Sequence, residues 1–286
     1  MFAPRLWAEP GYLAQADRLS YADKYQQSID LLRAHLPELS GPKEQAAVYW
    51  RLARDTFDVA NARETAAGSG KPYLSLYEQS DRYADRAIAL DPRSAKAYYW
   101  KAACVGKIAQ IQNLLRAFLS AGTVRDLLFT AGRLDPSDGE IWYVLAQLYS
   151  QIPGFPISFG NTAYAVSLGR KGLAARIAQV AERTEPNVPE DYYIQLAREL
   201  VRRNWSEAER ASRKAEEAAK YRATSNPVTR NFYYEGVVTI PKLSDRAEAV
   251  DLVKGVIARL ENVRDRTETQ RVDLAKARRD LAEWSR

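Results

Sequence analysis

The chain has 286 residues, 46% of them apolar, so it can bury an ample core and is not a disordered chain. Its 42 lysine and arginine residues against 36 acidic residues give a net charge of +6, spread along the chain, which is not a nucleic-acid-binding signature. The single cysteine, Cys104, excludes an intramolecular disulfide and a cysteine-built zinc site, and no apolar run approaches the roughly 18 residues of a membrane span.

The first ten residues, MFAPRLWAEP, are too short for a secretory signal. Within them, Leu6-Trp7-Ala8 loosely resembles the end of one. We therefore expect either an exported, periplasmic protein whose signal has been removed or a cytoplasmic protein.

A pattern of aromatic and small residues begins at Tyr12 and recurs along the chain. An aromatic residue is followed four residues later by a compact or aliphatic residue and, three later, usually by another apolar one. This spacing lies on one helix face, where a large ring beside a small residue lets another helix approach closely. The six triples, each expected to mark the first helix of a hairpin, are Tyr12/Ala16/Leu19, Tyr49/Ala53/Thr56, Tyr98/Ala102/Val105, Trp142/Ala146/Tyr149, Tyr192/Leu196/Glu199 and Tyr233/Val237/Ile240.

Each first helix is followed by a second one with small or aliphatic residues at the same spacing. These sets are Ser28/Leu32/His35, Ser80/Ala84/Ala87, Val124/Leu128/Ala131, Ala174/Ala178/Ala181, Ala208/Ser212/Ala215 and Ala249/Val253/Val256. Pro92, Pro136 and Pro186 close three of them, because proline ends a helix and turns the chain. We predict a single domain over 1–286, with hairpins near 11–40, 45–92, 95–136, 139–186, 189–222 and 229–262 and a capping helix near 265–286.

The three central hairpins are lengthened between their two helices. The gap from the aromatic residue to the first small residue of the second helix is 16 in hairpins one, five and six, but 31, 26 and 32 in the central three. Insertions on one edge of a repeat array often mark its binding face. The first, Arg63–Pro72, is predicted to be a flexible loop from its Gly and Ser content. The third, Gln151–Gly160, carries Phe155, Ile157 and Phe159, which either plug the edge or form a lip over a cleft.

The sequence resembles the tetratricopeptide-repeat (TPR) family, most closely in its fourth hairpin. The matching residues are Trp142, Leu145, Ala146 and Tyr149, followed by Ala174, Ala178, Ala181 and Pro186. The resemblance covers nearly the whole chain. It implies an all-α solenoid of about six helical hairpins that binds a partner in a groove.

Shorter phrases resemble more specific families. They are Tyr49–Arg54, Ala97–Ala102 and the turn Pro153–Gly160, which leads into a long helix expected from Thr162 to Thr184. They look like the T component of TRAP transporters, periplasmic proteins or lipoproteins that associate with a solute-binding subunit, and like the regulator-of-microtubule-dynamics family. The first resemblance implies a periplasmic solute-binding protein as partner. A lipoprotein would also need a lipidated N-terminal cysteine, and Cys104 lies far from the start.

In the TPR arrangement the residue after each consensus aromatic faces the groove. Here these residues are Leu13, Trp50, Tyr99, Tyr143, Tyr193 and Tyr234. Tyr and Trp give a large contact area with one polar handle, which suits recognition. The predicted partner- or ligand-binding residues are Trp50, Tyr99, Tyr143, Gln147, Tyr193, Tyr234, Phe155 and Phe159. The alternative for the aromatic ladder is packing in the core.

Catalysis has little support in the sequence. His35, the only histidine, occupies a packing position in one of the weakest hairpins, and Cys104 reads as a small core residue. We expect no enzymatic activity, metal or cofactor. The predicted function is a protein-interaction scaffold, the TPR partner of a solute-binding subunit. The alternatives are a small hydrophobic-ligand-binding protein and a cytoskeleton- or membrane-associated adaptor, and the sequence leaves the oligomeric state open.

Overall fold

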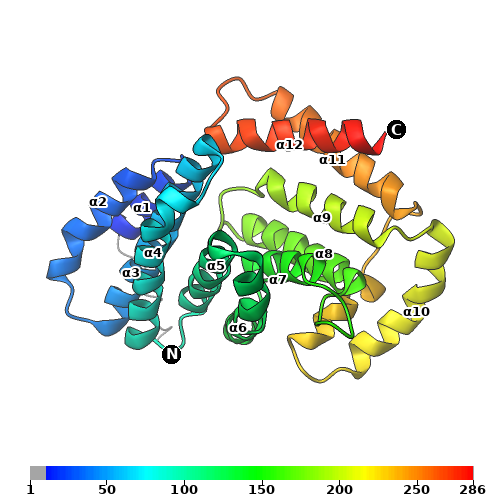
Figure 1. Cartoon of the computed structure of the whole chain (residues 1–286), viewed down its shortest axis with the longest axis horizontal. Coiled ribbons are helices and arrows are strands. Elements are labelled where there is room, and N and C mark those ends of the chain that lie inside the picture. Colours follow the sequence, from blue (N-terminus) through cyan, green and yellow to red (C-terminus); the bar gives the residue numbers. More distant parts are fainter. Residues whose placement is uncertain (1–10, 286) are drawn as a thin grey trace, which may run out of the picture. The chain divides into compact units, whose positions relative to one another are not determined.

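The computed structural model describes residues 11–285, and helices dominate these residues (Figure 1). The predicted all-α fold is confirmed, because residues 11–285 contain no strand beyond an isolated bridge between Gly154 and Gly160. The chain divides after Ser120 into two compact units. The single domain over 1–286 stays a prediction, and the signal-like Leu6-Trp7-Ala8 lies outside the described residues.

Unit 1 is a series of helices joined by short turns. Leu13 of α1, Leu32 of α2 and Leu52 of α3 meet in one apolar cluster. The elements are α1 (Gly11–Tyr21), α2 (Tyr25–His35), η1 (Leu36–Glu38), α3 (Pro42–Ala67), η2 (Lys71–Tyr73), α4 (Leu74–Leu90), α5 (Ala95–Gln112) and the start of α6 (Leu114–Leu134), which continues into unit 2.

The small residues of α4 pack as their spacing predicts. Ser80, Ala84 and Ala87 have no exposed surface, and the Ser80 hydroxyl donates a hydrogen bond to the Ala53 carbonyl oxygen of α3 at 2.6 Å. Cys104 of α5 is buried with its Sγ 3.0 Å from Ser80 Oγ, and burial raises the pKa of this thiol to about 12. A close fit around small side chains therefore holds α4 between α3 and α5.

The first insertion is less of a loop than predicted. Helix α3 continues through Arg63 to Ala67, and it ends where Gly68 adopts a left-handed φ of +69°. The alanine- and glutamate-containing stretch before Gly68 favours helix, and glycine is the residue that best tolerates the left-handed conformation. The prediction of a loop over Arg63–Pro72 is wrong for its first half.

Unit 2 holds the remaining helices. Its largest apolar cluster includes Leu196 and Leu200 of α9, Val253 and Val256 of α11, and Trp284 of α12. The C-terminal helix thus covers core residues of the preceding helices, as expected of a capping helix. The elements are the rest of α6, α7 (Gly139–Gln151), α8 (Thr162–Ala181), α9 (Glu190–Arg203), α10 (Glu207–Ala223), η3 (Thr229–Val237), α11 (Asp245–Glu261) and α12 (Glu268–Trp284).

Helix α8 buries a different face from the predicted one. Ala178 and Ala181 are exposed and Ala174 is only half-buried. The inward face instead includes Gly172, where an added Cβ would lie 3.1 Å from the Gly139 carbonyl oxygen of α7. Small residues occur on more than one face of α8, so their spacing did not identify the packing face, and the prediction for these three alanines is wrong.

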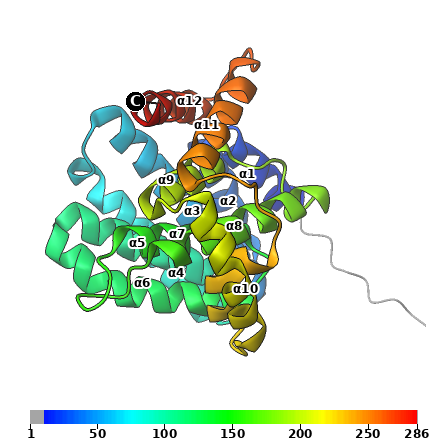
Figure 2. The ribbon, with the colours of Figure 1, turned by 90° about the vertical axis from the view of Figure 1, so that its right-hand side faces the viewer.

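The small residues of α10 are also exposed, contrary to prediction. Ala208, Ser212 and Ala215 face solvent, whereas Arg210 is 3% exposed. Figure 2 shows α10 on the side of the ribbon that faces the viewer. A charged side chain, and not the small residues, marks the buried side of this helix.

The first helix expected in the sixth hairpin is the 3₁₀ segment η3. Tyr233 within it has a non-helical φ of −117°, and Val237 is 40% exposed. The run of β-branched residues from Val237 to Ile240, followed by Pro241, disfavours an α-helix. Gly236 permits a close approach, because a Cβ there would lie 2.3 Å from the Ala218 nitrogen of α10.

Candidate binding cleft

A cleft of about 280 Å³ opens on unit 2 between α9, the segment that follows η3, and α11. Gly255 leaves one wall without a side chain, while leucine and proline side chains make the surface partly apolar. The residues that line the cleft are Tyr193, Pro241, Leu243, Glu248, Asp251, Leu252, Gly255 and Arg259. A cleft of this size matches one side chain of a partner better than a whole ligand, since small-molecule sites hold roughly 300–1,000 Å³.

The rim of the cleft is held by an aromatic and a cation. The Arg259 guanidinium lies 4.4 Å from the centroid of the Tyr193 ring, and its Nη2 lies 2.7 Å from Glu190 Oε2 at the start of α9. The cation–π contact and the ion pair restrict Arg259 from two sides. The ring of Tyr193 therefore presents a fixed surface to the cleft.

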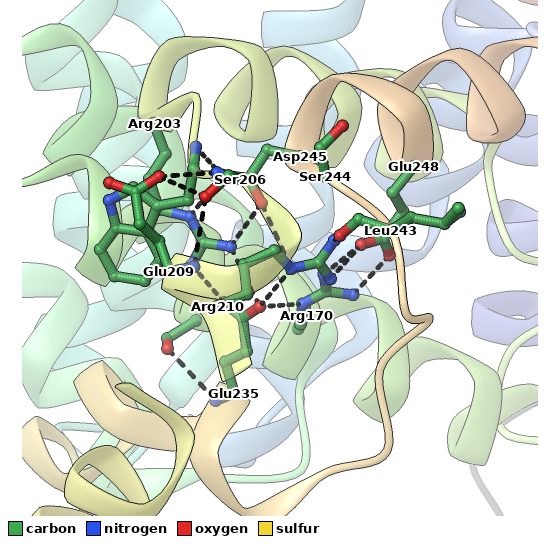
Figure 3. A network of polar contacts seen from close by, with 12 residues as sticks. Arg170, Arg203, Ser206, Glu209, Arg210, Glu235, Leu243, Ser244, Asp245 and Glu248 are labelled. Carbon is green, nitrogen blue, oxygen red and sulfur yellow. Dashed lines mark hydrogen bonds and ion pairs between the residues drawn. The ribbon is translucent and has the colours of Figure 1, made fainter. Parts of the chain in front are cut away.

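Glu248 connects the cleft to a buried set of charges that we call the Arg/acid cluster. Arg170 binds Glu248 through two hydrogen bonds of 2.8 and 2.7 Å, and Arg210 donates a third at 2.6 Å. The members of the cluster are Arg170, Arg203, Arg210, Glu235, Asp245 and Glu248 (Figure 3). They come from α8, α9, α10, η3 and α11, so the cluster fastens five elements behind the cleft.

Arg203 is the most enclosed member of the cluster. Its side chain has no exposed surface, and it donates to both oxygens of Asp245 at 2.8 Å and to both oxygens of Glu235. The same Asp245 carboxylate accepts the backbone N–H of Trp205, at 2.8 Å. Arg203 therefore joins the end of α9 to η3 and to the first turn of α11.

The charges of the Arg/acid cluster balance, with three cations against three anions. Burial acts to raise the pKa of Glu235, but hydrogen bonds from Arg203 and the nearby Arg170 and Arg210 outweigh it, so this pKa lies below its ordinary value. By contrast, Asp251 at the cleft is exposed and has no ion-pair or hydrogen-bond partner among residues 11–285. Its carboxylate is available to a ligand.

The predicted site residues are divided between the two units and have different surroundings. In unit 1, Trp50 lies under Arg51 at 4.2 Å, and Tyr99 is 7% exposed with its ring edge-on to Trp100 at 5.0 Å. Its neighbour Tyr98, predicted to pack, is the more exposed of the two. Tyr99 fits the core alternative, since so little of its surface is accessible.

In unit 2, Tyr193 is the predicted residue that lines the cleft. The Tyr143 hydroxyl donates to Asp191 and its ring stacks on Tyr192 at 4.6 Å, while Gln147 is half-buried. Tyr234 is half-buried, 6.2 Å from Tyr221. These residues stay predictions as a binding site.

The Gln151–Gly160 turn divides its aromatic residues between solvent and core. Phe155 is 93% exposed, so it plugs nothing. Phe159 packs on Tyr149 at 5.2 Å and under Arg125 at 4.8 Å. Asn161 then caps α8 by accepting the backbone N–H groups of Ala163 and Tyr164. Phe159 therefore packs within unit 2, while a role for Phe155 as a lip over a cleft stays a prediction.

The sequence reasoning missed Asp251, Arg259 and the Arg/acid cluster. Arg203 stands in an ordinary charged stretch, VRRNW, and Asp245 in SDRAE, where a solvent-exposed helix face is the usual reading. The sequence does hold one signal. Ser244-Asp245 begins α11 and Ser206-Glu207 begins α10, and a serine cap fixes the residue at which each helix starts and so which residues share a face. No group of three or more His, Cys, Asp or Glu residues within 11–285 is placed to hold a metal ion. None of the helices in this range is long and apolar enough to span a bilayer.

Comparison with known proteins places the fold and the family. A thermophilic TPR protein of Thermus thermophilus aligns over 94% of this chain and 98% of its own with a TM-score of 0.56, and at 14% identity this likeness shows the fold alone. Regulator of microtubule dynamics protein 1 is 28% identical over 143 residues in Bos taurus and 29% identical over 181 residues in Pongo abelii. These matches cover 48% and 61% of the chain and 43% and 54% of the relatives, so the chain spans about half the length of the curated relatives it matches. The family Regulator of microtubule dynamics protein 1-3 matches residues 12–155, half of the chain, and the chain belongs to this family.

Proposed function

We propose that this chain is a non-catalytic adaptor that binds a cytoskeleton-related protein through the cleft at Tyr193 and Asp251. The observation that carries the proposal is a fixed aromatic rim beside an unpaired carboxylate, above a charge cluster that holds the surrounding helices. Aromatic anchors next to a charged group are typical of protein-recognition hot spots. The names of the relatives and the TPR-like fold support a protein partner.

The chemistry of the cleft favours a lysine or arginine side chain of the partner. Leu243, Leu252 and Pro241 offer apolar surface to an aliphatic stem, and Asp251 offers an acceptor to its charged end. The Tyr193 ring adds a surface for a cation. The cleft volume of about 280 Å³ suits such a side chain and argues against a larger hydrophobic ligand.

The transporter-associated role has weaker support. The relatives named above carry the name of microtubule regulation, and none of them is named for transport. A periplasmic solute-binding partner and a periplasmic location therefore stay predictions from local sequence phrases.

The proposal is tested by co-sedimentation of the purified chain with stabilised microtubules. We expect the wild-type chain to pellet and Asp251→Asn and Tyr193→Ala each to weaken binding by about 1–3 kcal/mol, the range of interface hot spots. Asp251 is exposed, so thermal unfolding of Asp251→Asn should stay close to wild type. Tyr193 is half-buried against the apolar cluster of unit 2, so Tyr193→Ala should lose some stability and is compared at a temperature where it is fully folded. The matched control is Glu182→Gln, an exposed acid beyond the end of α8 and outside the cleft.

Two outcomes would overturn parts of this proposal. A wild-type chain that stays in the supernatant at every microtubule concentration would reject microtubules as the partner. Pelleting that is unchanged in Asp251→Asn and Tyr193→Ala would reject the cleft as the binding surface.

A further inference from the structure

An apolar surface unrelated to the cleft lies on the first turns of α6, within unit 1. Leu114 is 88% exposed, Leu115 66% and Leu119 65%. Phe118 is half-buried between them. At about 100° per residue, these four positions fall within one arc of roughly 140° of the helix. Three leucines this exposed on one face form an apolar patch that monomeric proteins rarely leave without a function.

The sequence around the patch is basic and contains no acid. Residues 92–125 include no aspartate or glutamate and six cations, namely Arg93, Lys96, Lys101, Lys107, Arg116 and Arg125. Three of these cations are neutralised by acids, since Lys101 pairs with Asp81 and Asp85, Lys107 with Glu64, and Arg125 with Asp126. Of the six cations, Arg116 is the one that lies between the exposed leucines in sequence.

Arg116 supplies an uncommitted cation beside the leucines. It is exposed, and its guanidinium has no ion-pair or hydrogen-bond partner among residues 11–285. It follows Leu115 directly, which puts it at the border of the apolar arc. A leucine face with an arginine at its edge is the arrangement of segments that lie in a membrane interface, with apolar side chains in the acyl boundary and cations at the headgroups.

We propose that the patch of Leu114, Leu115 and Leu119, with Arg116 at its edge, inserts into the interface of a bilayer that contains anionic lipids. The occupant follows from charge complementarity, because the uncommitted Arg116 at the edge of the leucines attracts anionic headgroups. A second copy of this chain is disfavoured, because the same basic segment would face itself. The patch is also small against the roughly 800 Å² that each partner of a standard protein complex buries.

The contact is weak and depends on both parts of the patch. Three leucines give less membrane affinity than a spanning helix or a pair of acyl chains, so binding should be reversible. Raising the salt concentration should weaken the Arg116 contribution, since exposed charges are screened beyond about 10 Å at 0.1 M salt. The leucine contribution should survive the same change in salt.

The experiment is flotation of the full chain with vesicles of phosphatidylcholine alone and with about 30% phosphatidylserine, a leaflet-like anionic charge. Wild type should bind the phosphatidylserine vesicles about fivefold more tightly than the neutral ones, as one arginine near the headgroups supplies. Leu114→Ser combined with Leu115→Ser should lower binding to the anionic vesicles at least tenfold. Arg116→Gln should remove much of the preference for phosphatidylserine and leave the weak binding to neutral vesicles.

The matched control is Ile177→Ser, because Ile177 is also an exposed apolar residue, at 48%, but lies in unit 2 and outside the predicted binding residues. It should float as wild type does. Far-ultraviolet circular dichroism checks that each variant folds, which is expected because every substituted side chain is exposed. Microtubule pelleting of the leucine variant should match wild type, so failure of this proposal and failure of the proposed adaptor function are distinguishable.

Three results would overturn the proposal. The first is wild type that binds neither kind of vesicle, and the second is a leucine variant that floats like wild type. The third is a wild-type oligomer, seen by light scattering after gel filtration, that becomes monomeric in the leucine variant, because the patch would then be an interface between copies of this chain.

Discussion

Helix α4 of unit 1 and helix α10 of unit 2 carry small residues at the same spacing but bury different kinds of side chain. The small residues of α4 have no exposed surface, and α4 lies between α3 and α5. In α10 the small residues are exposed, and the buried side chain is Arg210, which bonds to Glu248 and to the Leu243 carbonyl oxygen. One helix is held by close packing and the other by a charge network.

A helix can therefore be held in place by two kinds of contact, and the two respond to different kinds of mutation. Close packing around alanine tolerates no added volume, whereas a balanced charge network tolerates no missing partner. Helix α10 has little apolar surface to bury, because its sequence, EAERASRKAEEAAKYRA, contains only Tyr221 and alanines as apolar residues. Its position therefore depends on the Arg/acid cluster, and each test below probes one side of this contrast.

The largest effect is expected from Arg203→Met. This change keeps the volume of the side chain but leaves Glu235 and Asp245 buried without their main partner. Breaking a buried ion pair from one side costs about 3–5 kcal/mol. Urea unfolding followed by circular dichroism should show a loss of this size, and hydrogen exchange should be faster in α10.

Arg222→Met is the control for this substitution. Arg222 is exposed on α10, so its loss should change stability by no more than about 0.5 kcal/mol. If Arg203→Met unfolded at the same urea concentration as Arg222→Met, the Arg/acid cluster would not be what holds α10.

A smaller effect is expected from adding volume to the small residues. Ala84→Leu in α4 places a larger side chain where Ala84 has no exposed surface, and overpacking costs about 1–3 kcal/mol. Ala215→Leu in α10 extends into solvent and should change stability by at most about 0.5 kcal/mol. Thermal unfolding of the two variants side by side gives the comparison. Equal losses would show that α10 packs its small residues after all.

The same contrast explains how much of the fold could be predicted from the sequence. In α4 the spacing of Ser80, Ala84 and Ala87 identified the buried face, because no other face of that helix is as rich in small residues. In α10, alanines occur on several faces, and no apolar stripe selects one of them. The buried side of α10 is defined by partners from η3 and α11, more than 20 residues away, and helical spacing carries no information about those contacts.

The candidate cleft was predictable only in part for a related reason. Tyr193 was identified because it follows a packing aromatic, Tyr192, on α9. Asp251 and Arg259 belong to α11, and their place opposite Tyr193 follows from how α9 and α11 pack. The exposed leucines of α6 went unnoticed because an apolar run in a predicted helix is usually core.

The smallest expected effect is a pH dependence that originates in α10 and has no counterpart in α4. Burial, and then the negative charge of Glu235, raise the pKa of Glu217 from 4.5 to about 7. The folded chain binds the proton of the Glu217 carboxyl more tightly than the unfolded chain does. Protonated Glu217 therefore stabilises the fold fully below pH 4.5, and this stabilisation is lost as the pH rises to about 7. Glu217→Gln, which stays neutral, should therefore gain stability relative to wild type between pH 4.5 and 7.5, by less than about 1 kcal/mol because Glu217 is half-exposed.

The neighbouring Glu216 provides the matched control, because its shift has the opposite sign. A hydrogen bond and the positive charge of Lys220 lower the pKa of Glu216, so its contribution is present above pH 4.5 and is lost as the pH falls. Relative to wild type, Glu216→Gln should then become less stable, not more, over the same rise in pH. Melting temperatures of wild type and both variants at pH 4.5, 6 and 7.5 measure these differences. Subtracting the melting temperature of wild type at each pH removes the effect of other carboxyls that titrate in this range, among them Asp273 with a pKa of about 6. Parallel curves for wild type and Glu217→Gln would show that Glu217 is solvated in the folded chain and that α10 lies less tightly against η3 than its contacts indicate.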